Sequence, residues 1–470
     1  MPTTTIDLRG RDLIIMPPEA WLALTFTELL RRLFGIHLPA LVQASIVQDK
    51  RHLFLRTQPI YFSAIKRALR EQQTPFTVTF DEQPILPYTT TLAMEPRPYQ
   101  QEALGGWLAE GSQGVVVLPT GAGKTFVAAM AIHETGLWTL AVVPTIDLLQ
   151  QWRVALAAAL SLQADDIGVF GGGEKEVKPI TIITYDSAAL YPRELRHFGL
   201  LIFDECHHLP APTYRLIAES AFTPLRLGLS ATPERSDMAH ADLEELIGPE
   251  VYRRSPAELT EGRYLAQYQE QRIDVALASE DEARYNAQRR IYRSFLQRHR
   301  IRLNSPEDFQ RELIYRSARD PEARAAMLAW REARNIAMNA PAKYAEIERL
   351  LSQHAADQVI LFSEYNYVVE EISRRFCIPN ITYKTPAEER RVILERFRTG
   401  QYSKLVTGRV LNEGVDVPDC RVAIIVSGNS TKREYIQRLG RVLRPKEGRA
   451  HLYELITSGT TEEEIARRRR

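Results

Sequence analysis

Cysteine is scarce in this 470-residue chain, which contains only Cys206, Cys377 and Cys420. These residues lie far apart, and the sequence has no Cys-x-x-Cys pair. This pattern excludes a disulfide framework and a zinc ribbon, because both need paired or closely spaced cysteines. Few and scattered cysteines are typical of proteins from a reducing compartment. We therefore expect a cytoplasmic location.

Long apolar runs are also missing. The longest, at residues 115–118 and 422–426, fall well short of the roughly 20 residues needed to span a bilayer. Residues 1–10 include Asp7 and Arg9 and lack the apolar core of a secretory signal. We therefore expect a soluble protein with no membrane partner.

Net charge is almost absent, because 60 Lys and Arg residues are balanced by 59 Asp and Glu residues, leaving +1. This balance excludes a strongly basic nucleic-acid coat protein. A local basic groove is still allowed, since net charge averages over all faces of a molecule. Glycine and proline, with 24 and 27 residues, are near their usual abundance, which excludes collagen-like and low-complexity chains.

The composition is globular, with 44% hydrophobic and 25% charged residues. The length suggests about three domains. Residues 1–90 have the pattern of a small α/β domain. Residues 91–256 alternate short β-branched runs with helical stretches, which is typical of a parallel sheet covered by helices on both faces. The same alternation is present in residues 257–470, where a charged, arginine-rich helical insert interrupts it at about 280–340.

The strands that we expect in these two α/β blocks are short and apolar. They lie at residues 114–118, 139–143, 180–184, 200–203 and 226–229 in the first block, and at 267–277, 358–362, 404–407 and 421–426 in the second. The chain closes with an arginine run at residues 467–470, which we expect to be a disordered tail.

A glycine-rich turn follows the first of these strands. Gly121 and Gly123 precede Lys124 and Thr125, and helical periodicity begins directly afterwards. Glycines let backbone N–H groups approach phosphate oxygens, and the helix N-terminus adds a positive dipole end. Lys124 can reach the β- and γ-phosphates of a nucleotide, and the Thr125 hydroxyl can coordinate Mg²⁺. The strict pattern has another glycine where Leu118 stands. The predicted nucleotide-binding loop is Pro119, Thr120, Gly121, Ala122, Gly123, Lys124 and Thr125.

An acidic pair, Asp204 and Glu205, follows the apolar strand at 200–203. Ligands of α/β sheets bind at the carboxyl ends of the strands. Asp204 can hold Mg²⁺ directly or through water, and Glu205 can polarise an attacking water. The Cys-His-His run that comes next cannot easily converge on one tetrahedral metal ion. We expect a histidine in it to link the nucleotide site to neighbouring loops.

Three polar residues near the end of the chain, Gln437, Arg441 and Arg444, have helical i, i+4, i+7 spacing and so share one face. Arginine suits bidentate phosphate contact and stabilisation of transition-state charge. Residues 407–418 add a strand end, a turn and acidic residues. We predict a catalytic role for the three residues, with the two α/β blocks closing on one nucleotide. Taken alone, the helix is also compatible with a solvated basic face.

Together these elements resemble a superfamily-2 helicase. Motifs I, II, III, V and VI of that superfamily are matched, in order, by residues 119–125, 204–207, 230–232, 414–418 and 437–444. Within the superfamily the chain resembles the XPB group in its short archaeal or bacterial form, at residues 201–209, 227–237 and 433–444. The resemblance implies an N-terminal domain similar to a damage-recognition domain, two RecA-like motor domains and a helical thumb inserted in the second.

The resemblance also implies ATP-driven movement on DNA with 3′-to-5′ polarity, with ATP and Mg²⁺ bound, in nucleotide excision repair or transcription-linked DNA opening. Arg97 and Gln100 would lie on the adenine side, and Gly414 and Asp416 would also bind the nucleotide. The implied partners are single-stranded, duplex, forked or bubble DNA and an associated endonuclease, with the motor acting as a monomer. The residues implied to contact DNA are Thr145, Asp186, Ser187, Arg235, Asp237 and Thr407.

One position departs from the group's pattern. The Arg-Glu-Asp run that the group uses in duplex opening is Arg235-Ser236-Asp237 here, so the central carboxylate is absent. We expect ATP hydrolysis to be unaffected and strand separation to be weaker. An alternative function is therefore an ATP-gated DNA-binding switch, or a motor that recruits a partner nuclease with little strand separation. A further alternative is the motor subunit of a restriction or remodelling system. The lack of a nuclease or methyltransferase segment argues against a self-contained version of such a system.

The helical insert interleaves arginines with Tyr285, Tyr292 and Phe295. Arginines can contact phosphates and aromatic rings can stack on bases. We therefore expect these three rings to be available on a DNA-facing surface, with a plain solvated face as the alternative. The arginines concerned are Arg284, Arg289, Arg290, Arg293, Arg298, Arg300 and Arg302.

Overall fold

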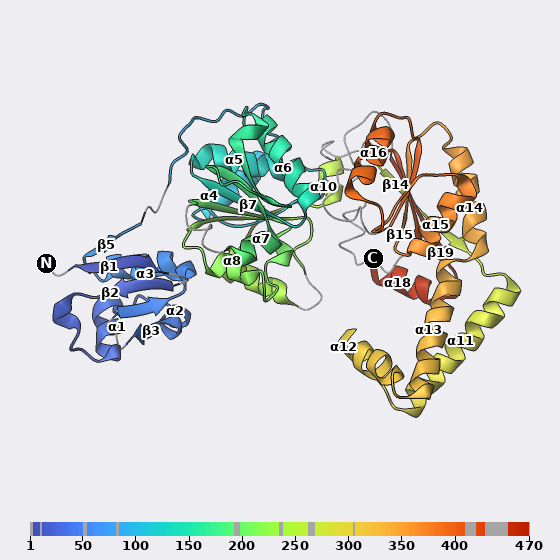
Figure 1. Cartoon of the computed structure of the whole chain (residues 1–470), viewed down its shortest axis with the longest axis horizontal. Helices are drawn as coiled ribbons and strands as arrows, with labels where there is room; N and C mark the ends of the chain where they lie inside the picture. Colours follow the sequence, from blue (N-terminus) through green and yellow to red (C-terminus); the bar gives the residue numbers. More distant parts are fainter. Residues whose placement is uncertain are drawn as a thin grey trace. The chain divides into compact units, whose positions relative to one another are not determined.

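The computed structural model divides into two compact units, Met1–Leu259 and Thr260–Arg470 (Figure 1). Each unit contains a large parallel sheet, and the first also carries a smaller sheet at its N-terminal end. The described residues are 3–9, 12–49, 54–80, 84–191, 198–234, 238–261, 268–303, 306–408, 420–427 and 450–469.

The N-terminal module is a five-stranded sheet with helices packed on it. It contains β1 (Thr4–Arg9), β2 (Asp12–Met16), α1 (Phe26–Phe34), α2 (Ala40–Ser45), β3 (Val47–Asp49), β4 (Phe54–Thr57), α3 (Phe62–Glu71) and β5 (Phe76–Val78). The strand order is β3-β4-β2-β1-β5. Thr25 and Glu28 form a capping box that starts α1. The apolar faces of α1 and α3 bury Leu33 and Ile65 against the sheet, which gives the module a core of its own.

The first α/β domain follows. Its elements are α4 (Pro98–Ala109), β6 (Gln113–Val117), α5 (Lys124–Thr135), β7 (Thr139–Val143), α6 (Ile146–Ala159), β8 (Ile167–Gly171), β9 (Glu174–Lys175), β10 (Ile180–Thr184), α7 (Tyr185–Leu190), β11 (Leu200–Asp204), α8 (Arg215–Glu219), β12 (Leu225–Ser230), α9 (Leu243–Leu246), β13 (Glu250–Arg253) and α10 (Pro256–Glu261).

Its eight strands lie in the order β13-β6-β12-β11-β7-β10-β8-β9, and only β9 is antiparallel to its neighbour. Strands β7, β10 and β11 are buried along their whole length. Full burial on both faces is why these strands read as continuous apolar runs and not as alternating ones. All five strands expected in this block are present. Strands β8, β9 and β13 were not expected. Strand β8 contains two glycines, β9 is only two residues long, and β13 lies at the edge of the sheet.

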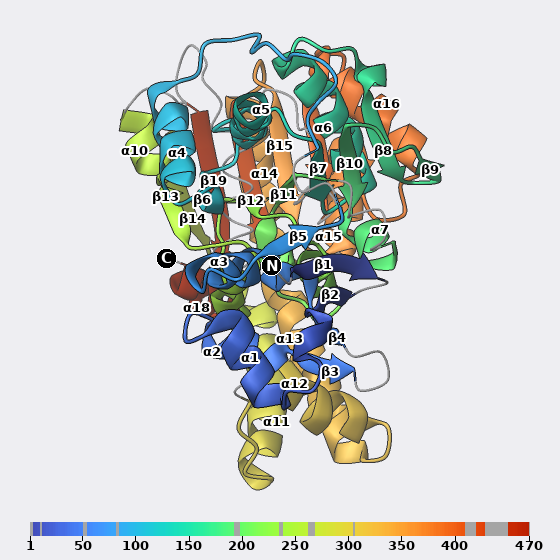
Figure 2. The ribbon, with the colours of Figure 1, turned by 90° about the vertical axis from the view of Figure 1, so that its left-hand side faces the viewer.

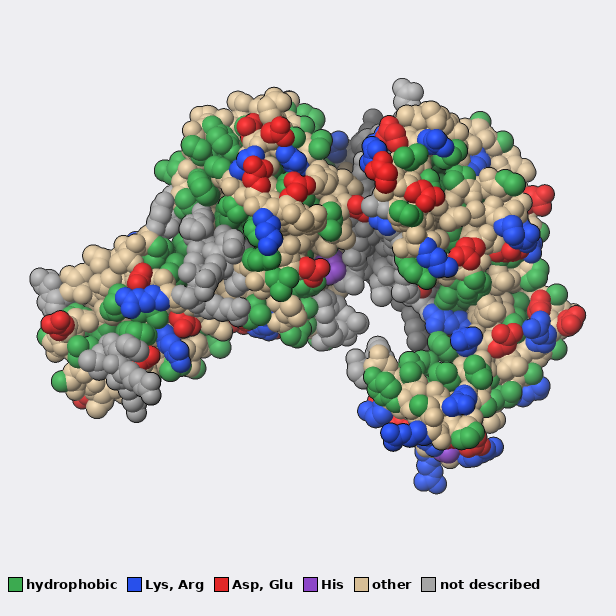
Figure 3. Space-filling model, in the orientation of Figure 1, with side chains coloured by type: hydrophobic (Ala, Val, Ile, Leu, Met, Phe, Trp, Pro, Cys, Tyr) green, Lys and Arg blue, Asp and Glu red, His purple; other side chains and the backbone are tan. Residues whose placement is uncertain are grey.

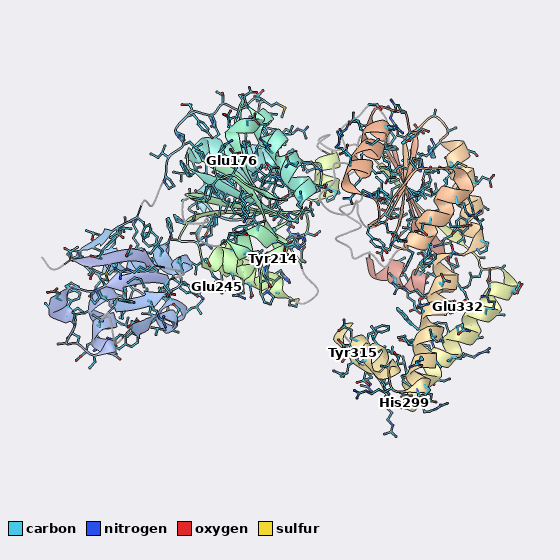
Figure 4. The ribbon with its side chains drawn as sticks, in the orientation of Figure 1. Glu176, Tyr214, Glu245, His299, Tyr315 and Glu332 are labelled. Carbon is cyan, nitrogen blue, oxygen red and sulfur yellow. The ribbon has the colours of Figure 1, made fainter. Side chains whose placement is uncertain are left out.

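The N-terminal module packs on this first α/β domain through an aromatic cluster. Phe222, in the loop after α8, lies with its ring centroid 6.0 Å from that of Phe62 and 4.6 Å from that of Phe80. At the same border the Tyr61 hydroxyl donates a hydrogen bond to Glu245 Oε1 at 3.1 Å, and Figure 4 labels Glu245 there. The module is therefore held by both apolar and polar contacts.

The second unit consists of β14 (Tyr268–Val275), α11 (Ser279–Arg298), α12 (Pro306–Phe309), the π-helical turn η7 (Gln310–Tyr315), α13 (Pro321–Met338), α14 (Pro341–Gln353), β15 (Val359–Ser363), α15 (Asn366–Phe376), β16 (Asn380–Ile381), α16 (Ala387–Arg398), β17 (Lys404–Thr407), β18 (Val422–Ser427), β19 (Ala450–Thr457) and α18 (Thr461–Arg469). Its six-stranded sheet has the order β14-β19-β18-β15-β17-β16 and is parallel throughout.

The helical insert is a hairpin of α11 and α13 that extends away from this sheet (Figures 1 and 2). Its interior buries Tyr292, Phe295 and Leu313. Tyr285 is buried at the base, where its hydroxyl accepts a hydrogen bond from the Thr461 backbone N–H at 2.8 Å. The expectation that Tyr285, Tyr292 and Phe295 are available for base stacking is therefore wrong, because the rings form the core of the hairpin.

The arginines of the insert have a different environment. Six of the seven expected arginines are exposed, and Arg289 is half-buried with its guanidinium 5.7 Å from the Tyr292 ring centroid. Lys and Arg side chains are scattered over the insert surface in Figure 3, among hydrophobic and acidic side chains. Some are neutralised locally, since Arg284 pairs with both Asp281 and Glu332.

The end of the chain also differs from expectation. Residues through Arg469 form α18, so the expected disordered tail is wrong for residues 467–469. Arg467 pairs with Glu463 one turn earlier, which is a stabilising i, i+4 arrangement. The expected fold class is confirmed: two parallel-sheet domains, a small N-terminal α/β module and a helical insert. Within the described residues, no helix has the length and apolar character needed to cross a membrane.

Candidate active site

The candidate site lies at the carboxyl edge of the first sheet. Strand β12 runs between β6 and β11, and all three are parallel. Their carboxyl ends therefore deliver three segments to one place: the glycine-rich loop after β6, Asp204 and Glu205 at the end of β11, and Ser230 at the end of β12. This is the edge at which open α/β sheets bind ligands.

The glycine-rich loop depends on two residues with positive φ. Gly121 has a φ of +85°, and Gly123 has a φ of +80° and caps the N-terminus of α5. A Cβ on Gly123 would lie 2.6 Å from Gln100 Nε2, so any side chain there would displace Gln100. Leu118, where the strict pattern has glycine, is fully buried, and its N–H donates to Ser230 O at 3.0 Å. Leu118 thus continues the backbone pairing with β12 one residue past the end of β6 and does not need a glycine conformation.

A second segment braces the loop from outside. Arg97 caps α4, and its backbone N–H donates to Gln100 Oε1 at 3.0 Å. Gln100 Nε2 and the Tyr99 hydroxyl both donate to the carbonyl of Ala122, at 3.2 and 2.7 Å. Gln100 and Tyr99 are almost fully buried. The predicted adenine-side residues are thus tied directly to the predicted phosphate loop.

Lys124 and Glu205 form the central ion pair of the site. Lys124 Nζ lies 3.4 Å from Glu205 Oε1, and the two side chains are only 11% and 13% exposed. The other carboxylate oxygen of Glu205 lies 3.4 Å from His207 Nδ1 and accepts a hydrogen bond from Ser230 Oγ at 3.4 Å. His207 Nδ1 is also 3.3 Å from Ser230 Oγ. His207 thus links Glu205 to Ser230 at the end of the neighbouring strand β12.

Glu205 is held in an unusual backbone conformation. Its φ is +45°, in the left-handed region, which costs a non-glycine residue about 1 kcal/mol or more. Burial opposes its ionisation, but the Lys124 charge and the hydrogen bond from His207 outweigh burial and hold the pKa of Glu205 below its ordinary value. Glu205 is therefore kept as a carboxylate, the form that can accept a proton or orient a water.

Asp204 has the opposite electrostatics. Its carboxylate accepts a hydrogen bond from Trp152 Nε1 at 3.1 Å, and its backbone carbonyl accepts one from the Tyr185 hydroxyl at 3.0 Å. Burial, followed by the adjacent Glu205 charge, raises the pKa of Asp204, and Lys124 offsets that shift only in part. A buried carboxylate that lacks sufficient positive charge is one that a divalent cation would stabilise.

The residues present fit a nucleotide with Mg²⁺. Thr120 Oγ1, within the loop, is a buried hydroxyl for which the described residues offer no hydrogen-bond partner. The loop presents glycines and the start of α5, where unsatisfied N–H groups are available to an anion. Asp204 supplies a hard oxygen ligand, and the Thr125 hydroxyl lies in the first turn of α5.

Comparisons with known proteins agree with this geometry. Residues 93–235 match the family model described as "Type III restriction enzyme, res subunit", and residues 342–446 match "Helicase conserved C-terminal domain". Over 378 residues the chain is 45% identical to "DNA 3'-5' translocase XPB2" of Sulfurisphaera tokodaii, a match that covers 80% of this chain and 85% of that protein.

The chain belongs to the XPB family of superfamily-2 helicases. It is also 33% identical to "DNA 3'-5' helicase XPB" of Kineococcus radiotolerans, over 79% of this chain and 62% of that protein. The chain therefore spans less than two thirds of that longer relative. Membership confirms the expected family and enzyme class: the protein is a helicase-type, ATP-using enzyme.

A solved structure gives the same fold at low identity. The "Pyrococcus furiosus Hef helicase domain" superposes with a TM-score of 0.56 at 18% sequence identity, covering 79% of this chain and 97% of that one. At that identity the likeness concerns the fold, which is the paired RecA-like sheet architecture of helicases.

Several residues expected to contact DNA are described. Thr145 caps α6 by accepting a hydrogen bond from Leu148 N at 3.2 Å. Asp186 accepts a hydrogen bond from the Tyr214 hydroxyl, and Ser187 accepts one from Thr184 Oγ1. These residues follow the neighbouring parallel strands β7 and β10, so they share the carboxyl edge with the ion pair. Thr407 differs from them, because it is fully buried at the end of β17 and donates to Gly408 O.

Other predicted residues of the XPB-family motifs lie outside the described residues. They are Arg235, Ser236, Asp237, Gly414, Asp416, Gln437, Arg441 and Arg444. Their roles stay predictions from the sequence.

Sequence reasoning did not predict three contacts of the site: those of Tyr99, Trp152 and Ser230 with Ala122, Asp204 and Glu205 respectively. The contact of Trp152 could have been predicted in part from the sequence. A buried tryptophan N–H needs a hydrogen-bond acceptor, and few acceptors are available inside an α/β sheet domain. Ser230 was recognised as part of a motif, but its contact with Glu205 depends on strand order, which the sequence does not state.

Proposed function

We propose that the protein is an ATP-driven motor that moves along DNA with 3′-to-5′ polarity, in nucleotide excision repair or transcription-linked DNA opening. Family membership supports this proposal, as do the printed names of relatives that are DNA 3′-5′ translocases or helicases. The substrates are single-stranded, duplex, forked or bubble DNA. The motor acts as a monomer, located in the cytoplasm, and works with a partner endonuclease.

One observation carries the proposal: the ion pair of Lys124 and Glu205, with Ser230 and His207 on the far side of the carboxylate. Lys124 binds the β- and γ-phosphates of ATP, together with the loop amides. Glu205 orients the attacking water and accepts its proton. Ser230 and His207 contact the second carboxylate oxygen of Glu205. A change in the charge around Glu205 therefore alters their interaction with it.

Thr125 and Asp204 are the residues that would hold Mg²⁺. When bound, the ion neutralises charge on the phosphates and polarises the transferred phosphoryl group. Trp152 keeps the Asp204 carboxylate in place by donating to it. Gln100, braced against Ala122, contacts the adenine from the other side of the loop, with Arg97 beside it.

The second α/β domain supplies the remaining charge. Arg441 and Arg444 neutralise the transition state and Gln437 positions the attacking group, because their i, i+4, i+7 spacing in the sequence would put them on one face of a helix. Gly414 and Asp416 complete the nucleotide site from the same domain. Closure of the two domains on ATP, and opening after hydrolysis, produces the step along DNA.

A variant of this function has a specific observation in its favour. Ser236 stands where the group has a glutamate used in duplex opening, and the relative at 45% identity is called a translocase. We propose movement on duplex DNA with weak strand separation, and a contribution to nuclease recruitment or gating.

The decisive experiment measures ATP turnover with single-stranded, duplex and bubble DNA side by side, and strand release from a labelled fork. We expect DNA to stimulate turnover, with little strand released. Lys124→Ala should abolish turnover on every substrate, whereas Lys384→Ala, an exposed lysine of the second unit, serves as the matched control. Turnover that is indifferent to all three DNAs would contradict the proposal.

A further inference from the structure

A continuous series of contacting side chains connects the segment after β15 to the helical insert. It consists of Tyr367, Tyr365, Arg334, Trp330 and Phe309, which we call the ladder. The Arg334 guanidinium lies 5.3 Å from the Tyr365 ring centroid and 5.0 Å from that of Trp330. Tyr365 and Tyr367 are 5.6 Å apart, and Trp330 and Phe309 are 4.7 Å apart. Each contact is within the range of attractive cation–π or aromatic pairing.

One end of the ladder is attached to the carboxyl edge of the second sheet. Tyr365 follows β15, and its N–H donates to Ser363 Oγ at 3.1 Å. Ser363 Oγ is 2.8 Å from Ser427 Oγ at the end of β18. On the other side, a Cβ on Gly408 would lie 3.0 Å from Asn366 Oδ1, so this loop also fits closely against the end of β17. The loop is therefore packed between the ends of two strands.

The other end of the ladder reaches the free end of the insert. Phe309 closes α12 and leads into the π-helical turn η7, whose Leu313 is fully buried against the same aromatic residues. Tyr315, the last residue of η7, is 67% exposed and lies beside α12 in Figure 4. A displacement at the ladder would thus reach an exposed surface far along the insert.

Arg334 is the only charged member of the ladder, and it does more than stack. Its Nε donates a hydrogen bond to the Tyr365 hydroxyl at 2.7 Å. A planar guanidinium can lie between two rings and donate at its edge, which a lysine ammonium cannot do. Nearby, Thr457 Oγ1 donates to Ala337 O and Thr461 N donates to the Tyr285 hydroxyl, so the base of the hairpin is held at the end of β19 as well.

We propose that Arg334 is a positioning residue that couples the carboxyl edge of the second sheet to the helical insert. Edge movements during the ATP cycle are transmitted through Tyr365, Arg334 and Trp330 to the segment that carries Tyr315. This rests on the proposed motor function, because the coupling matters only if ATP turnover moves the protein on DNA. ATP hydrolysis itself does not require Arg334, since the residue lies in the insert and not at the nucleotide loop.

The test measures base pairs travelled per ATP hydrolysed, from triplex displacement and ATP turnover on the same duplex. Arg334→Gln should keep its DNA-independent turnover and its thermal midpoint close to wild type. It should lower the distance per ATP about fivefold, a typical size for loss of a coupling residue. Arg331→Gln is the matched control, because Arg331 is exposed on the same helix. Arg334→Lys, which keeps the charge and loses the planar fork, should be intermediate.

A double-variant cycle separates coupling from general damage. Trp330→Leu should lower the distance per ATP by the same factor. The double variant of Trp330→Leu and Arg334→Gln should lower it no further than either single variant, because either change alone already interrupts the series of contacts. An unchanged distance per ATP in Arg334→Gln would overturn this inference and leave the motor function intact. A wild-type protein that hydrolyses ATP without moving would overturn the motor function itself, and the inference with it.

Discussion

Lys124 and Glu205 form an ion pair across the carboxyl edge of the first sheet, with Nζ 3.4 Å from Oε1 and both side chains nearly buried. Lys124 begins α5 and Glu205 directly follows β11, so the two residues are far apart in the sequence. Their pairing places the cation proposed to bind phosphate beside the carboxylate proposed to orient water. The ionised form of Glu205 is favoured by this arrangement, which holds its pKa below the ordinary value despite burial.

Glu205→Gln should abolish ATP hydrolysis while leaving nucleotide binding largely intact. The amide keeps the size of the side chain and cannot accept a proton, so turnover should fall on the order of 10²–10⁴-fold. Turnover assays and binding of a fluorescent ATP analogue would measure the two effects separately. Wild-type turnover in Glu205→Gln would remove the role assigned to this carboxylate.

Arg441→Ala should slow hydrolysis by on the order of 10³-fold or more, with nucleotide affinity little changed, by analogy with arginine fingers. The reason is that a finger stabilises charge that develops only in the transition state. Single-turnover hydrolysis at saturating ATP measures the rate of the chemical step, and an ATP-binding titration measures the affinity separately. An equal loss of binding and rate would instead indicate ground-state contact with the phosphates.

Arg226→Met should destabilise the first unit. Arg226 is buried in β12, and its guanidinium donates to the backbone carbonyls of Ala218, Ala221, Thr223 and Leu246. Burial lowers its pKa to about 10. Removing the donors would take one hydrogen bond from each of these four carbonyls, of which Ala218 O keeps its bond from Ala221 N, at about 3 kcal/mol or more in total. Denaturant midpoints would measure the loss.

Arg253→Met is the control for that experiment. Arg253 is 45% exposed and pairs with Glu234 and Glu250 at the surface, where such pairs are worth about 0–1 kcal/mol. Equal destabilisation by the two variants would show that the buried, hydrogen-bonded guanidinium of Arg226 has no special structural role.

Docking of the N-terminal module should weaken at high pH. Burial, followed by the Glu245 charge, raises the pKa of Tyr61 to about 12. A raised pKa means that the folded state favours the neutral phenol. Its contribution is therefore fully present below about pH 10, the unfolded value, and is lost as the pH rises from about 10 to 12.

Tyr61→Phe gives the comparison, because phenylalanine cannot ionise. The difference in unfolding free energy between wild type and Tyr61→Phe should be constant below about pH 10 and should then shift against wild type. Protease nicking between the module and the first α/β domain would report the same change. A difference that does not vary with pH would mean that the Tyr61–Glu245 contact does not form in solution.

Much of the site could be read from local patterns. The apolar runs before Lys124 and Asp204 are strands because both faces of each are buried, and the turns that follow them are specified by glycine or by acidic residues at a sheet edge. Local patterns alone therefore place Lys124, Asp204 and Glu205 after the carboxyl ends of their strands. The helical insert could also be located, because a long charged segment without β-branched runs favours helix.

Tertiary neighbours decided what local patterns could not. The same aromatic spacing in α11 fits either a surface for stacking or a hairpin interior, and only the packing of α13 turned Tyr292 and Phe295 inward. Likewise, α18 forms where a disordered arginine tail was expected, held by Glu463 and the end of β19.

The sequence by itself determined which residues carry phosphate and acid–base chemistry, since those depend on residue type and on immediate neighbours in the chain. Only the tertiary structure decided that β12 lies between β6 and β11, which brings Ser230 to Glu205, and that Arg334 lies between Tyr365 and Trp330. The reason is physical: strand order and burial depend on partners distant in sequence, whose contacts leave no local periodicity to read.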